Sequence, residues 1–172
     1  MRHLVYDRGA EAPGRGRDNR RPVAFEARDA ALGETGPAED LLAAWRDGRV
    51  KQRVVSRALA LRARSPGLFT EGAYMPLRVD GPLAEHVLAY ARVHEGRTAV
   101  AACTRLAAKL PGVGDAPLVA AQAWQGTAIV LPRSLVNRRW SDVLTGAEGA
   151  TGGRLAAADL LATLPVALLE VR

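Results

Sequence analysis

The stretch that decides the fold is HVLAYARVH at residues 86–94, because its side chains alternate in kind. One face of such a strand carries only small apolar residues, namely Val87, Ala89, Ala91 and Val93. The other face is mixed, as in a sheet that packs on one side. A second apolar run, Thr98–Leu106, follows after Glu95-Gly96. This succession predicts antiparallel strands joined by a turn.

The same reading extends to the rest of the chain beyond Gly67, where short runs of strand-forming residues are separated by Gly and Pro. Seven closely spaced runs predict an antiparallel sandwich. Asp159–Leu164 is expected to form a helical turn before the last of them. The seven runs are Tyr74–Val79, His86–His94, Thr98–Leu106, Thr127–Leu131, Trp140–Thr145, Arg154–Ala158 and Val166–Val171.

In the N-terminal third of the chain, the apolar residues do not follow the strand pattern seen after Gly67. Residues 1–22 show neither a helical nor a strand period and are expected to form an irregular arm. Short helices are predicted over 24–32 and Glu39–Arg46. A longer helix is predicted over Arg49–Arg64, where apolar residues recur at helical spacing until Ser65-Pro66-Gly67 ends it.

The fold class is therefore α+β, with a boundary between two parts near residue 68. Residues 1–68 would be an arm plus a helical segment, and residues 69–172 would be an all-β antiparallel sandwich of about seven strands. A pair of amphipathic helices usually packs on something larger. The helical segment therefore suggests that the chain forms part of a bigger assembly.

Composition excludes several classes of protein. The 172 residues are 48% hydrophobic and 24% charged, with a formal net charge of +6, which is typical of a globular protein. Of the basic residues, 22 are arginines, a bias often found in GC-rich genomes, so the charge alone does not indicate nucleic acid. No run of 18 apolar residues and no apolar signal segment are present, so we expect a cytoplasmic protein without a membrane span.

The residues offer little catalytic chemistry. A single cysteine, Cys103, excludes an intrachain disulfide and lies in an apolar strand, where it would serve as a small hydrophobe. His86 and His94 are eight residues apart on one predicted strand, too far apart to share a metal ion, and we expect both at the surface. The carboxylates fall mostly in loops or on exposed helix faces, so no catalytic pair and no metal site are predicted.

Two binding hypotheses remain from the residues alone. The basic residues around the 49–64 helix resemble a nucleic-acid surface, but they also occupy the positions that any solvated helix face would have, which makes nucleic acid an unfavoured partner. Trp124 and Trp140 flank a strand and could stack on a sugar ring, although packing in a small core is the favoured role.

Several segments, taken in order, are similar to the C-terminal end of maltooligosyltrehalose synthase, a glycoside hydrolase family 13 enzyme of the α-amylase superfamily. The similarity covers about residues 18–172 and is most specific in DNRRPV and in WSDVLTG. The first 17 residues do not share it. The segments are DNRRPV (18–23), AWRDGRVK (44–51), LALRARSPGLF (59–69), GAYMPL (72–77), WQGTAIVLP (124–132), WSDVLTG (140–146) and LPVALL (164–169).

The resemblance implies a (β/α)₈ barrel followed by a β-sandwich in the whole enzyme. Family members convert the reducing-end α-1,4 bond of a maltooligosaccharide into an α,α-1,1 bond by intramolecular transglycosylation, a step of trehalose biosynthesis that needs no cofactor. The family's catalytic carboxylates lie on barrel strands upstream of the matched segments, so the chain alone is expected to be inactive. Residues 49–65 would correspond to the last barrel helix.

The resemblance also suggests site residues and partners. Asp18, Asn19, Arg20 and Arg21 would lie near the rim of a barrel mouth and are the expected substrate-binding residues. The expected partners are a maltooligosaccharide and a barrel domain or a second copy of the chain, which would cover the barrel-facing side of the 49–65 helix. The alternative functions are a non-catalytic carbohydrate- or protein-binding sandwich module and a basic nucleic-acid-binding protein.

Overall fold

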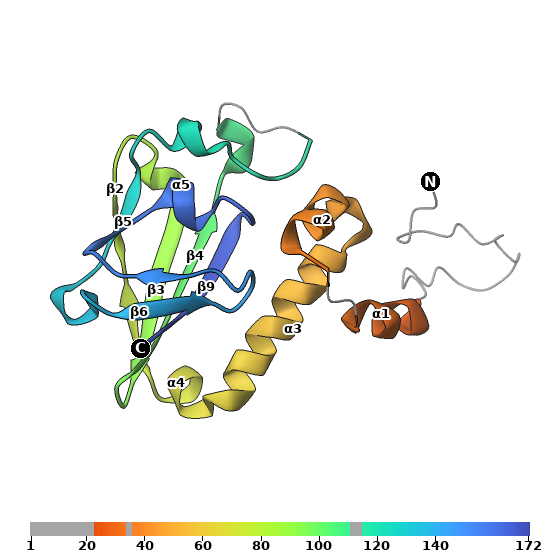
Figure 1. Cartoon of the computed structure of the whole chain (residues 1–172), viewed down its shortest axis with the longest axis horizontal. Helices are drawn as coiled ribbons and strands as arrows, with labels where there is room; N and C mark the ends of the chain where they lie inside the picture. Colours follow the sequence, from red (N-terminus) through yellow and green to blue (C-terminus); the bar gives the residue numbers. More distant parts are fainter. Residues whose placement is uncertain (1–22, 34–35, 111–114) are drawn as a thin grey trace, which may run out of the picture.

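The computed structural model describes residues 23–33, 36–110 and 115–172. Among these residues, helices precede and flank two antiparallel sheets (Figure 1). The helices are α1 (Phe25–Leu32), α2 (Ala38–Ala43), α3 (Arg49–Arg64), α4 (Pro66–Thr70) and α5 (Ala157–Leu160). The strands are β1 (Ala73–Pro76), β2 (Arg78–Asp80), β3 (Val87–His94), β4 (Arg97–Thr104), β5 (Ala128–Val130), β6 (Arg139–Asp142), β7 (Glu148–Ala150), β8 (Arg154–Ala156) and β9 (Val166–Val171).

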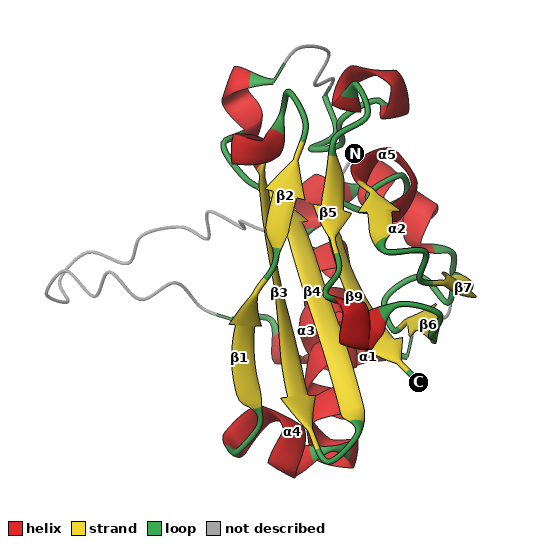
Figure 2. Ribbon diagram, turned by 90° about the vertical axis from the view of Figure 1, so that its left-hand side faces the viewer, coloured by secondary structure: helices red, strands yellow, loops and turns green. Residues whose placement is uncertain are grey.

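The strands form one large and one small sheet. The six-stranded sheet has the order β1-β3-β4-β9-β6-β7, and the three-stranded sheet has the order β2-β5-β8. Figure 2 shows the long strands β3, β4 and β9 side by side in the middle of the large sheet. All strand pairings among the described residues are antiparallel, which confirms the α+β class with a β-sandwich-like second part.

The central hairpin follows from the sequence pattern. β3 pairs with β4 in a register that sets Val87 opposite Thr104 and His94 opposite Arg97. Glu95 and Gly96 connect the strands with φ values of 45° and 77°. Two consecutive left-handed residues give a turn whose twist matches that of the strands, and Gly tolerates such a φ at no steric cost.

The main core lies between the two sheets. It contains the small apolar face of β3, Val100 and Ala102 of β4, and Leu169 of β9 from the large sheet. The three-stranded sheet and its loops contribute Ile129 and Trp124, which are fully buried. The alternation predicted for residues 86–94 is thereby confirmed for Val87, Ala89 and Ala91.

The helical segment packs on the opposite face of the large sheet. Leu61 of α3 and Leu68 of α4 form a buried cluster with Ala99, whose neighbours in β4 point the other way, into the main core. A second cluster joins α2 to the β6–β7 and α5–β9 loops, with the buried residues Ala38, Leu42, Leu144 and Leu164. Helices, large sheet and small sheet therefore form successive layers (Figure 1).

Several predicted elements differ in detail. The run Tyr74–Val79 forms two strands in different sheets, β1 and β2, separated by the buried Leu77. The predicted helix Glu39–Arg46 ends at Ala43 and continues as a 3₁₀ turn, Trp45–Asp47. Ser65 ends α3 as predicted, but Pro66 then starts α4, because proline is well suited to the first position of a helix. β7 was not predicted at all.

The region before β3 corrects a further expectation. His86 lies in a 3₁₀ turn and is buried, whereas the sequence predicted a surface histidine at a strand end. Its Nδ1 lies 3.4 Å from the carbonyl oxygen of Arg105.

Within residues 23–33, 36–110 and 115–172, no helix is long and apolar enough to cross a membrane.

Candidate functional site

The four residues expected to bind substrate, Asp18, Asn19, Arg20 and Arg21, lie outside the described residues. Their expected role therefore stays a prediction. The remaining candidates are carboxylates, arginines, aromatic side chains and apolar helix faces, whose geometry decides what chemistry each can perform.

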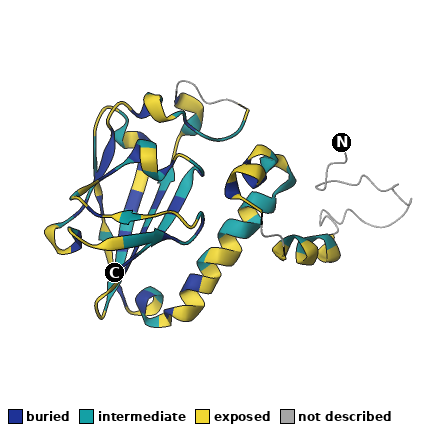
Figure 3. Ribbon diagram, viewed as in Figure 1, coloured by how far each residue is buried: buried dark blue, intermediate teal, exposed yellow. Residues whose placement is uncertain are grey.

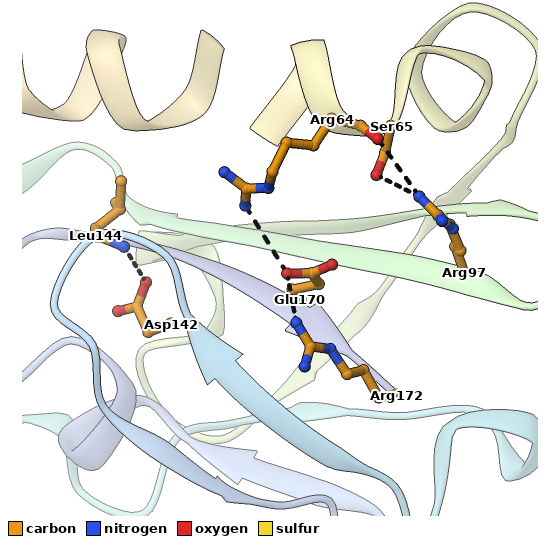
Figure 4. Close-up of polar contacts among 7 residues, drawn as sticks. All are labelled: Arg64, Ser65, Arg97, Asp142, Leu144, Glu170 and Arg172. Carbon is orange, nitrogen blue, oxygen red and sulfur yellow. Dashed lines mark hydrogen bonds and ion pairs between the residues drawn. The ribbon is translucent and has the colours of Figure 1, made fainter. Parts of the chain in front are cut away.

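Asp142 is the one buried carboxylate among the described residues, with 4% of its surface exposed. Its Oδ1 accepts hydrogen bonds from the backbone N–H of Leu144 at 2.9 Å and of Leu168 at 3.2 Å. Its Oδ2 accepts a hydrogen bond from Oγ1 of Thr145 at 2.9 Å. Figure 4 shows the carboxylate turned toward its own β6–β7 loop. These contacts hold β6, the loop and β9 together, so Asp142 serves the fold rather than a reaction.

Metal ligation has no support in the described part of the chain, where no three His, Cys, Asp or Glu side chains converge. Cys103 is half-buried, and burial raises the pKa of its thiol above the usual value. A thiol held in its protonated form is a poor nucleophile. Cys103 is thus suited to packing, as the sequence predicted.

The aromatic residues divide into buried and exposed groups. Trp124 is 1% exposed in the main core, which confirms the packing role and removes it as a sugar platform. Trp140 is partly buried and lies against Gly149, where an added Cβ would come within 2.6 Å of its ring. The candidates that remain are Tyr74 on β1, which is exposed, and Tyr90 on β3, which is half-buried, with ring centroids 5.1 Å apart and an interplanar angle of 35°.

The basic residues around α3 are partly engaged by the protein itself. Arg46 forms a bidentate ion pair with the carboxylate of Asp115, at 2.6 and 2.5 Å, and lies over the ring of Trp45. The Arg46 guanidinium lowers the pKa of Asp115 by hydrogen bonding and charge. Arg49 pairs with Asp47, and Arg53 donates to the carbonyl oxygen of Gly36. Nucleic-acid binding stays an untested alternative.

The helical segment also has an open apolar side. Val55 and Leu59, one turn apart on α3, are exposed, as are Phe25 and Leu32 on α1. Phe25 is 77% exposed, an unusual value for a large apolar residue. We call these four side chains the outer helical face. Figure 3 shows exposed residues along α1 and along the side of α3 turned away from the sheets.

Comparisons with known proteins relate this arrangement to one enzyme. No established sequence-family profile matches the chain. Two curated proteins from strains of Mycobacterium tuberculosis, both named maltooligosyl trehalose synthase, are 35% identical over 152 residues. This alignment covers 88% of the chain but 16% of each relative.

Solved structures agree with the sequence matches. Maltooligosyltrehalose synthase from Arthrobacter ramosus superposes with a TM-score of 0.66 at 36% identity, covering 91% of this chain and 18% of that one. A mutant of the same enzyme gives a TM-score of 0.65. Fold and matches together define a β-sandwich module homologous to the C-terminal part of a much longer enzyme. The particular family is maltooligosyltrehalose synthase, and the chain is homologous to its C-terminal region.

Proposed function

We propose that this chain is the non-catalytic C-terminal module of a maltooligosyltrehalose synthase and that the outer helical face docks onto the catalytic barrel. The single observation that carries the proposal is that α3 has apolar side chains on two sides. Leu61 packs on the large sheet, whereas Val55 and Leu59 face outward. A helix that is apolar on both sides is normally covered on both.

The length of the relatives supports a barrel as the covering partner. The chain spans 18% of the Arthrobacter ramosus enzyme, so most of that protein lies outside the matched region. A large, preceding body is therefore available in the family to cover α1 and α3. Burial of one leucine side chain contributes about 1.5–3 kcal/mol, so the four side chains together can hold two bodies in contact.

Activity tests the first half of the proposal. The purified full chain, incubated with maltohexaose, should give no non-reducing trehalosyl product, because the one buried carboxylate of residues 23–33, 36–110 and 115–172, that of Asp142, is occupied by backbone hydrogen bonds. The intact Arthrobacter ramosus enzyme serves as the positive control. Formation of the trehalosyl product by the chain alone would contradict the proposal.

Docking tests the second half. The chain is mixed with the Arthrobacter ramosus enzyme from which the matching region has been deleted, and association is measured by light scattering. We expect a complex with the unaltered chain and about tenfold or greater weakening by Leu59→Glu. Leu106→Glu is the matched control, since Leu106 is also exposed but lies after β4. Equal weakening by both variants, or no complex at all, would contradict docking through this face.

A second candidate function is saccharide binding at Tyr74 and Tyr90. The adjacent rings on the large sheet support it, because Tyr74 is exposed, Tyr90 is half-buried beside it, and aromatic faces are common platforms for sugars. Calorimetric titration with maltopentaose tests it. We expect binding that Tyr74→Ala abolishes, and no heat with the unaltered chain would reject this second function.

A further inference from the structure

A polar cavity of about 500 Å³ opens where the end of α3 meets the large sheet. It lies between the last turn of α3, the start of β4 and the end of β9. Three arginines and one glutamate dominate its wall. Figure 4 shows Arg64 and Arg172 reaching toward Glu170, and Arg97 turned toward Ser65. The polar wall residues are Arg64, Ser65, Arg97, Thr98, Glu170 and Arg172.

The sheet register brings these residues together from distant parts of the chain. β4 pairs with β9 so that Thr98 lies opposite Val171 and Ala99 opposite Glu170. Leu61 fixes the end of α3 above the same strands by packing on Ala99. The cavity therefore has a rigid floor of paired strands and a rigid wall of helix.

Two of the arginines share one carboxylate. Nη2 of Arg172 lies 3.2 Å from Oε2 of Glu170, and Nη2 of Arg64 lies 3.9 Å from the same oxygen. The glutamate side chain is 25% exposed, so the carboxylate is the more buried partner. Arg97 is held separately, because its Nη1 donates to Oγ of Ser65 at 2.9 Å and to the carbonyl oxygen of Arg64 at 3.5 Å.

The charges in this cavity do not balance. The wall carries three guanidinium groups but only one carboxylate side chain, which leaves its side chains with a net charge of about +2. Each guanidinium has five N–H donors in a planar fork, more than the contacts to Glu170 and Ser65 use. A phosphate monoester carries a charge of about −1.5 to −2 at neutral pH and has three acceptor oxygens, so it matches both the charge and the donor geometry.

We propose that this cavity is a binding site for a small organic phosphate, with Arg64, Arg97 and Arg172 as its ligands. Glu170 holds two of the arginines in place when the site is empty and competes with the phosphate for them. A volume of about 500 Å³ accommodates a molecule of the size of a sugar phosphate. The proposal does not depend on the docking of α3 to a barrel.

Glu170→Gln gives the sharpest test, because removal of a competing negative charge should strengthen binding. Calorimetric titrations of the full chain at constant ionic strength would use inorganic phosphate and glucose 6-phosphate, with glucose as the uncharged control. We expect both phosphates to bind and glucose not to bind. Glu170→Gln should tighten binding about tenfold, and Arg97→Gln should weaken it about tenfold or more.

The chain contains a matched control for surface charge. Asp80 pairs with both Arg78 and Arg154, at 3.1 and 3.2 Å, but this cluster lies on strands β2 and β8 of the small sheet and is not part of the wall of the polar cavity. Asp80→Asn should therefore leave phosphate binding unchanged. Equal tightening by Asp80→Asn and Glu170→Gln would overturn the proposal, and so would the absence of phosphate binding in both the unaltered chain and Glu170→Gln, once circular dichroism has shown that the variants are folded.

Discussion

Substitution of Asp142 provides the most direct test of the fold, because this one buried side chain on β6 accepts hydrogen bonds from backbone donors in β9 and in the β6–β7 loop. In Asp142→Ala the N–H groups of Leu144 and Leu168 lose their acceptor. Each unsatisfied buried N–H costs about 1–3 kcal/mol, so the variant should lose about 2–6 kcal/mol of the free energy of unfolding. This is a large share of the 5–15 kcal/mol typical of a domain.

Asp142→Asn separates the hydrogen bonds from the charge. Its amide oxygen can still accept from both N–H groups, and its amide nitrogen can donate to the hydroxyl oxygen of Thr145, so we expect a loss of about 1–2 kcal/mol. Urea unfolding followed by tryptophan fluorescence measures both variants. With a slope of about 2 kcal/mol per M, the alanine variant should unfold at a midpoint about 1–3 M lower. An alanine variant no less stable than the asparagine variant would refute the role assigned to Asp142.

Three further predictions concern other parts of the chain. Leu61→Ala should lower the free energy of unfolding by about 2–5 kcal/mol because it opens a cavity between α3 and the sheet, whereas the exposed Leu59→Ala should change it by about 0.5 kcal/mol or less, and urea unfolding compares the two. Because burial raises the pKa of Cys103, its reaction with an aromatic disulfide reagent at pH 8 should be slower than that of free cysteine, and an equal rate would contradict this. Because Arg46 lowers the pKa of Asp115, the pair contributes stability above the unfolded pKa of Asp115, about 3.9, and loses it as the pH falls through the lower folded value. Carboxyl NMR titration should find the midpoint of Asp115 below its ordinary range and return it there in Arg46→Gln.

The sequence predicted the elements whose signal is local. The alternation in residues 86–94 and the helical period of Arg49–Arg64 depend on neighbours a few residues away, and β3 and α3 follow them closely. β7 was not predicted, because the strand Glu148–Ala150 is only three residues long and contains a glycine. Its pairing with β6 depends on Gly149, which leaves room for the Trp140 ring, a contact that only the folded structure reveals.

The site residues were harder to predict for the same reason. Arg64, Arg97 and Arg172 have no shared motif and are brought together by the register of β4 with β9. Nothing in their local sequence distinguishes them from the other arginines of the chain. Tyr74 and Tyr90 likewise become neighbours through the pairing of β1 with β3, which sets Tyr90 opposite Pro76. Their proximity required knowledge of which runs pair.

The contacts of the segment WSDVLTG explain why these residues occur together. Trp140 packs on the β7 backbone at Gly149, and Asp142 binds the N–H of Leu144 two residues on, as in an Asx turn. Thr145 donates to the same carboxylate, and Gly146 adopts a left-handed φ of 82°. Each of these residues is required by the geometry of one β6–β7 connection. The resemblance to the synthase family in this segment therefore reflects a shared fold.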